Sequence, residues 1–150
     1  MTKIGAGYRL SAVTMAGVVG AGLLVVGWPV VSFLASYGCG DREDRLAEVV
    51  AGEAVLGDGL KGATAEESYR ECDDDDRFVV VGARYRYGGS VDSVLEHYGR
   101  AARDEGWAAS GSGCFAKDLG GTTAYLTVEG PDDGRFHVEI VADAEGSPWC

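Results

Sequence analysis

The amino-acid sequence predicts an α+β protein. We expect an N-terminal transmembrane helix followed by a small ectodomain with one amphipathic helix packed on an antiparallel sheet. Three observations predict this fold class. Residues 10–40 form a run of 31 positions without Asp, Glu, Lys or Arg. After this run, one segment places apolar residues at helical spacing, and several short segments alternate apolar with polar residues as strands do. Four cysteines, the first at position 39, complete the pattern.

The uncharged run is long enough to cross a bilayer. A membrane helix needs about 20 apolar residues, and residues 10–35 supply 26. Lys3 and Arg9 precede the run, whereas every acidic residue follows it. Cytoplasmic flanks carry the excess of Lys and Arg, so we expect residues 1–9 in the cytoplasm. Residues 10–37 then contact the lipid of a bacterial cell membrane as a single-pass signal anchor, and the C-terminal domain is extracytoplasmic.

Two other fates of the N-terminal segment stay open. Ser36 and Gly38 are small residues at the −3 and −1 positions before Cys39, which would suit cleavage of a secretory peptide. Lipoprotein processing at Cys39 is the other alternative, although Ser36 stands where Leu is usual. The length of the apolar run favours the retained anchor, because signal peptides have apolar regions of about 7–15 residues.

Small residues within the run allow a homodimer through the membrane helix. Ala12, Ala16 and Gly20 follow one another at four-residue spacing. Such stripes let membrane helices approach closely.

The charge balance restricts the partners of the ectodomain. Beyond residue 40 the chain has 11 basic residues against 24 acidic ones, a formal charge of −13 compared with −11 for the whole chain. A domain this acidic repels nucleic acid and anionic lipid headgroups, so no nucleic-acid partner is expected. The partner that remains is an unknown envelope protein or ligand.

Disulfide bonds are the expected state of Cys39, Cys72, Cys114 and Cys150. None of them forms a C-x-x-C pair, so neither a zinc ribbon nor a thioredoxin-like motif is supported. An even number of cysteines outside the cytoplasm predicts disulfides, and four cysteines allow three connectivities. We favour Cys72–Cys114 within the sheet region, with Cys39–Cys150 joining the two ends of the ectodomain.

The ectodomain divides into residues 41–62, a juxtamembrane helix and loop, and residues 63–150, the α+β domain. Asp41 is expected to cap a helix that runs to about Leu56, with a narrow stripe at helical spacing formed by Leu46, Val49, Val50 and Glu53 or Ala54. This helix would act as a stalk beside the membrane or as a lid on the sheet.

The clearest elements of the domain are one strand and one helix. Residues 78–87 alternate, with Val79, Val81, Ala83, Tyr85 and Tyr87 on one face. A helix over residues 91–105 follows, capped by Ser90 and ended by Gly106. Its apolar stripe comprises Val91, Val94, Leu95, Tyr98, Ala101 and Ala102.

Four further strands are expected at residues 68–72, 107–117, 122–129 and 135–142. In the strand at residues 122–129, one face carries Ala124, Leu126 and Val128. In the strand at residues 135–142, one face carries Phe136, Val138 and Ile140. Residues 130–134 predict a hairpin in which Pro131 presets φ and Gly supplies the positive φ.

No catalytic, metal or cofactor site emerges from the residues that have suitable chemistry. Residues 73–76 are four consecutive Asp, which indicate a solvated turn rather than an EF-hand loop. His97 and His137 lie off the apolar faces of their elements and are expected at the surface. Ser90 follows two glycines but fits a helix cap better than a nucleophile elbow. Trp107 fits a core position between helix and sheet. Residues 110–113 are expected to form an irregular strand rather than an anion-binding site.

A resemblance covers residues 66–142. The order of Cys72 with an acidic turn, a strand, Tyr98 in a helix, Gly106 and Trp107, Cys114 and a hairpin resembles small membrane-anchored or lipoprotein-like extracytoplasmic proteins of actinobacteria. The complete lack of Asn and Gln fits the bias of a GC-rich genome. The resemblance implies a location outside the cytoplasm and carries no catalytic residue over to this chain.

These observations favour a non-catalytic extracytoplasmic binding or structural domain anchored in a bacterial cell membrane. One alternative is an envelope enzyme or metal-binding protein that uses residues 73–76 and Glu139. The other is a homodimeric assembly module driven by the membrane helix.

Overall fold

The computed structural model describes residues 37–150. The expected cytoplasmic residues 1–9 and nearly all of the expected signal anchor at 10–37 lie outside the described residues. In the part that is described, no helix is both long and apolar enough to span a membrane.

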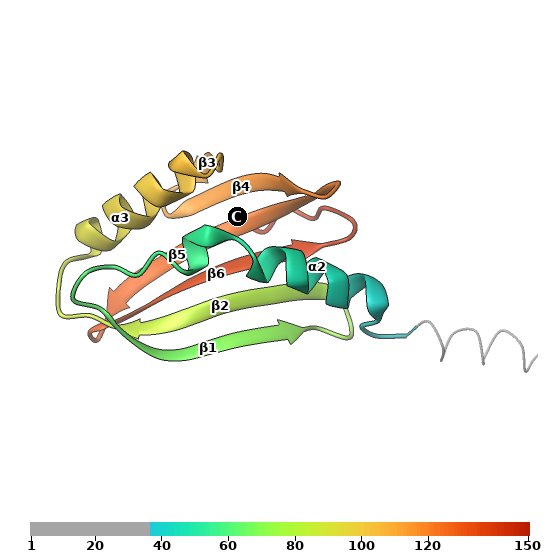
Figure 1. Ribbon diagram of the computed structural model, residues 1–150, viewed down its shortest axis with the longest axis horizontal. Coiled ribbons are helices and arrows are strands. Elements are labelled where there is room, and N and C mark those ends of the chain that lie inside the picture. Colours follow the sequence, from blue (N-terminus) through green and yellow to red (C-terminus); the bar gives the residue numbers. More distant parts are fainter. Residues whose placement is uncertain (1–36) are drawn as a thin grey trace, which may run out of the picture. The chain divides into compact units, whose positions relative to one another are not determined.

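The described chain is α+β, with a six-stranded antiparallel sheet of order β1-β2-β6-β5-β4-β3 (Figure 1). Residues 38–150 make one compact unit. In chain order the elements are α2 (Asp41–Ala51), the 3₁₀ helix η1 (Ala54–Leu56), β1 (Thr64–Cys72), β2 (Phe78–Arg86), α3 (Val91–Asp104), β3 (Ala108–Gly111), β4 (Cys114–Leu119), β5 (Thr122–Asp132) and β6 (Arg135–Asp143).

One face of the sheet carries the core, as the alternation in the sequence predicts. Its side chains pair across neighbouring strands: Val81 lies opposite Ile140, and Ile140 lies opposite Leu126. Helices α2 and α3 contribute to the same buried cluster, so both cover this face. The largest fully buried side chains are Tyr98, Phe136, Leu126, Ile140, Val50, Val55, Val79, Val94 and Val138.

Helix α3 matches its prediction except at its first residue. Ser90 is the N-cap, and its side chain accepts a hydrogen bond from the Ser93 backbone N–H at 3.2 Å. Val94 and Tyr98 are fully buried, and Gly106 follows the helix with a φ of +84°. Val91 was expected in the core but is 44% exposed, because the packed stripe begins one turn later.

Helix α2 is shorter than predicted and is capped by a different residue. The N-cap is Gly40, not Asp41, and its backbone N–H donates to Glu43 Oε2 at 3.0 Å. The helix ends at Ala51 because Gly52 follows, and η1 continues the chain. The helix packs against β1, β2 and β6 and so acts as a lid on the sheet.

The apolar stripe predicted for α2 was partly wrong. Val50 is buried as expected, and Ala47 is buried beside it. Val49, however, is 49% exposed, because the face toward the sheet is centred on Ala47 and Val50.

Two strand predictions need correction. β1 begins at Thr64 rather than at residue 68, because pairing with β2 extends a sequence that has little strand propensity of its own. The single irregular strand expected at 107–117 is two strands, β3 and β4, which pair antiparallel. The chain reverses between them at Gly113, whose φ is +69°.

The β5–β6 hairpin also turns at a different place. Asp132 pairs with Arg135, so Asp133 and Gly134 are the two turn residues, with φ of 46° and 76°. Positive φ at both positions is typical of a type I′ hairpin. Pro131 therefore lies in the irregular last part of β5 and does not form the corner of the turn.

Two disulfide bonds cross-link the unit. The pairing that we favoured from the sequence, Cys72–Cys114 with Cys39–Cys150, was wrong. The bridges are Cys39–Cys72 and Cys114–Cys150, with Cα–Cα distances of 6.3 and 6.2 Å. Cys39 lies before α2 and is brought to the end of β1. The segment after β6 crosses the sheet face opposite the helices to reach β4, with the Trp149 and Phe78 ring centroids 4.6 Å apart.

Candidate functional site

The acidic turn at residues 73–76 is used for structure. Asp73 Oδ1 accepts hydrogen bonds from the backbone N–H groups of Asp75 and Asp76, each at 2.9 Å. Asp74 Oδ1 accepts from the Cys39 backbone N–H at 2.9 Å. The turn thus helps to hold the Cys39 segment beside β1. Across residues 37–150, no group of three or more His, Cys, Asp or Glu is placed to hold a metal ion.

The two histidines lie on different sides of the sheet and have separate partners. His97 on α3 has its Nε2 2.9 Å from the Asp58 carbonyl oxygen, with its ring edge-on to Tyr98. His137 on β6 has its Nε2 3.5 Å from Glu129 Oε2. The two imidazoles therefore do not form one site.

The remaining sequence candidates also have structural positions. Ser90 caps α3. Residues 110 and 111 end β3, where its pairing with β4 shifts register, and residues 112 and 113 form the turn to β4. Trp107 lies in the core, as predicted, with 2% of its surface exposed. Lys117 Nζ lies 5.5 Å from the centroid of its ring.

A groove lies between the C-terminal end of α2 and the strands β1 and β2. Its volume is about 410 Å³, within the range of ligand pockets. The residues that line it are small or apolar except on β1: Ala51, Leu56, Gly57, Ser68, Tyr69, Arg70, Val81, Gly82 and Ala83. Arg70 Nη2 donates to the Asp44 carbonyl oxygen at 2.9 Å, which ties β1 to α2 beside the groove.

β1 forms one edge of the sheet and flanks this groove (Figure 1). Tyr69 lies over Gly82 of β2, and its hydroxyl donates to Glu139 Oε2 on β6 at 2.8 Å. A side chain at Gly82 would block this path, since a Cβ there would lie 2.7 Å from the Tyr69 oxygen. Burial raises the pKa of Tyr69, and the bond to Glu139 raises it further, so the phenol stays protonated and donates. The edge strand β1 is therefore tied to β6, two strands away, by the hydrogen bond between Tyr69 and Glu139.

The free face of β1 carries carboxylates. Glu67 pairs with Arg84 at 2.7 Å, and the Arg84 guanidinium lies 5.3 Å from the centroid of the Tyr69 ring. Glu71 lies beyond Tyr69 on the same face and is exposed.

Glu66 is an exposed carboxylate that bridges two arginines, Arg86 and Arg135. Desolvation acts to raise its pKa, but the hydrogen bonds from these arginines outweigh it and hold the pKa below the ordinary Glu value.

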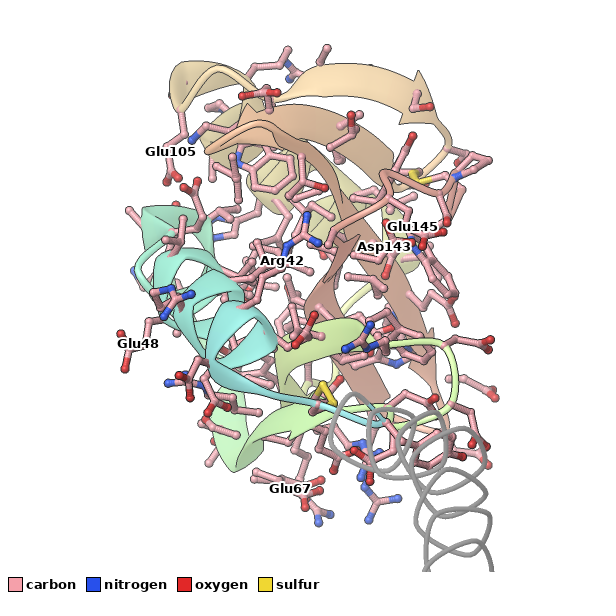
Figure 2. All side chains as sticks on the ribbon, turned by 90° about the vertical axis from the view of Figure 1, so that its right-hand side faces the viewer. Arg42, Glu48, Glu67, Glu105, Asp143 and Glu145 are labelled. Atoms are coloured by element: carbon pink, nitrogen blue, oxygen red, sulfur yellow. A yellow bond between two sulfur atoms is a disulfide. The ribbon has the colours of Figure 1, made fainter. Side chains whose placement is uncertain are left out.

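Two smaller hollows lie elsewhere on the unit. One of about 220 Å³ is lined by Arg42, Arg45 and Val49 of α2 and by the β4–β5 turn. The other, about 230 Å³, lies beside Asp143 and Glu145. Figure 2 shows Asp143 and Glu145 on the far side of the sheet from α2. Glu67 lies at the edge of the sheet that β1 forms.

The carboxylate of Asp143 holds the C-terminal segment through hydrogen bonds. Its carboxylate accepts hydrogen bonds from the backbone N–H groups of Glu145 and Ser147 and from Trp149 Nε1. Burial alone raises the pKa of this carboxyl, but the bonds from Ser147, Gly146 and Glu145 outweigh it and lower the pKa.

No family model, curated protein or solved structure matches this chain. The groove beside β1 is therefore identified from its geometry. Sequence reasoning missed it because the groove forms only when α2 and η1 fold over β1 and β2, which brings together residues that are distant in the chain.

Proposed function

We propose that the protein is a non-catalytic binding or structural domain, held on the extracytoplasmic side of a bacterial cell membrane by residues 10–37. One observation carries the proposal: all four cysteines pair, which leaves no free thiol in residues 37–150. Disulfides persist in oxidising compartments and are rare in the cytosol. The apolar run and the basic residues before it fit the same topology.

The engagement of the reactive side chains supports a binding or structural role. Asp73 and Asp74 accept backbone hydrogen bonds, Glu139 accepts from Tyr69, and Ser90 caps a helix. Asp73, Asp74 and Glu139 were candidates for the alternative of a metal-assisted enzyme, and Ser90 was considered as a nucleophile. Each of them has a structural task in the fold.

The three lysines of the chain provide a test of the topology. Lys3 precedes the apolar run, whereas Lys61 is exposed on the folded unit. A membrane-impermeant amine reagent should label Lys61 in intact cells that express the full chain, and should label Lys3 only after permeabilisation. Peptide mass mapping locates the label, and Lys61→Arg is the control for its assignment. Labelling of Lys3 with Lys61 protected in intact cells would refute the topology.

A further inference from the structure

We propose that the protein binds a partner by adding an extended peptide segment as a further strand along β1. The added segment would turn small or apolar side chains into the groove beside α2 and Lys or Arg side chains toward Glu71. This inference deepens the proposed function and rests on it for the compartment in which the partner is met.

The backbone of β1 supplies the first requirement. β1 pairs with β2 from Thr64 to Cys72, and no other described strand pairs with its outer side. Figure 1 shows β1 as the border of the sheet. An edge strand presents unpaired N–H and C=O groups, and an extended peptide can satisfy them by strand addition.

The edge is held in place before any partner arrives. Cys72 is bonded to Cys39, Tyr69 reaches β6 through Glu139, and Arg70 bonds the backbone of α2. These ties join β1 to the segment before α2, to β6 and to α2 itself. A preorganised strand loses little conformational freedom when a partner binds, which favours affinity.

The groove defines one face of the added strand. Alternate side chains of a strand point to the same side, so those on the α2 side would enter the space lined by Ala51, Leu56 and Ser68. Its floor is Val81 and Ala83, which are both buried. Small or apolar side chains fit this space.

Charge defines the other face. Glu67 and Glu71 lie on the side of β1 away from the groove, with Tyr69 between them. Arg84 already pairs with Glu67, so the exposed Glu71 is the carboxylate that would meet a basic side chain. The folded part carries a formal charge of −13, which attracts a cationic partner and speeds the encounter. The expected recognition pattern is therefore basic side chains alternating with small or apolar ones.

The same charges select against a second copy of the chain. Three of the nine β1 residues are Glu and one is Arg, so pairing of two β1 strands would bring together two acidic edges. The register shift between Ala65 and Glu67 also breaks the regular edge at its start. The usable edge is thus residues 67–72.

The test uses the full chain in nanodiscs of phosphatidylcholine, a lipid without net charge. The probe is a fluorescent seven-residue peptide with Lys at odd positions and Val or Ala at even positions. A peptide of the same composition with its lysines in one block is the control. Fluorescence anisotropy should show saturable binding of the alternating peptide and at least about five-fold weaker binding of the block peptide, since only alternation matches both faces.

Two pairs of variants locate the contact. Glu71→Lys should weaken binding about five-fold by placing like charges opposite each other. Glu145→Lys makes the same charge change in the segment after β6, two strands away from β1, and should alter binding by less than about two-fold. Ala51→Phe fills the groove and should weaken binding more than about ten-fold, whereas Ala109→Phe on exposed β3 should leave it unchanged.

Equal weakening by Glu71→Lys and Glu145→Lys would show attraction to net charge alone and overturn the proposal. Equal binding of the alternating and block peptides would do the same. A chain that dimerises in light scattering, with Glu71→Lys altering the dimer, would also overturn it in favour of self-pairing. If Lys61 is labelled in intact cells but the alternating peptide does not bind, this inference is wrong and the proposed topology stands. If the alternating peptide binds but Lys61 is protected from the reagent in intact cells, the proposed topology is wrong and the peptide site stands.

Discussion

Removal of the Cys39–Cys72 bridge should cost a large part of the stability of the folded unit. The bridge closes a loop with a sequence separation of 33. In the chain-entropy description, closing a loop of this length stabilises the native state by about 4 kcal/mol. Because small domains are stable by about 5–15 kcal/mol, Cys39→Ser with Cys72→Ser removes between a quarter and most of the total.

Urea unfolding of the full chain, followed by Trp emission, measures this loss. With an m-value of about 2 kcal/mol/M, the midpoint should fall by about 2 M. Cys114→Ser with Cys150→Ser is the matched control, because that bridge has a sequence separation of 36 and should cost nearly the same. The two loops do not overlap in sequence, so the four-fold variant should lose close to the sum of both effects.

The refuting results are specific. A loss below about 1 kcal/mol for the Cys39 and Cys72 pair would contradict the entropic reasoning. A non-reducing peptide map that links Cys72 to Cys114 would contradict the connectivity itself.

Four further substitutions test what stabilises the folded unit. Gly82→Ala should destabilise the unit by about 1–3 kcal/mol in urea, because the added methyl meets Tyr69. Val94→Ala should cost about 2–3 kcal/mol, whereas Val91→Ala should stay within about 0.5 kcal/mol because Val91 is exposed. Asp143 has a lowered folded-state pKa, so its contribution is present above the unfolded value of about 3.9 and is lost as pH falls through the folded value. Asp143→Asn should therefore lower stability at pH 7 and remove that part of the acid dependence, as measured by urea midpoints from pH 2 to 7.

The elements with strong local signals could be predicted from the sequence. Ser90 and Gly106 mark the two ends of α3, and the alternation around Val81 and Ile140 gives the buried face of the sheet. In each case the decisive residues are neighbours in the chain, and their helical or strand period identifies the buried side.

The features that depend on distant partners could not be predicted. β1 is rich in Glu and becomes a long strand only because β2 pairs with it. The disulfide pairing depends on where α2 and the C-terminal segment fold, and four cysteines alone allow three answers. The groove has the same origin, since Ala51 and Val81 are brought together only in the folded unit.

The most direct measurement of the central claim is the mass of the full chain extracted from native membranes into an alkylating reagent, with and without prior reduction. The account predicts no alkylation without reduction, four alkylated cysteines after it, and a mass that retains residues 1–38. Free thiols in the unreduced protein would place the folded unit in a reducing compartment and contradict the account.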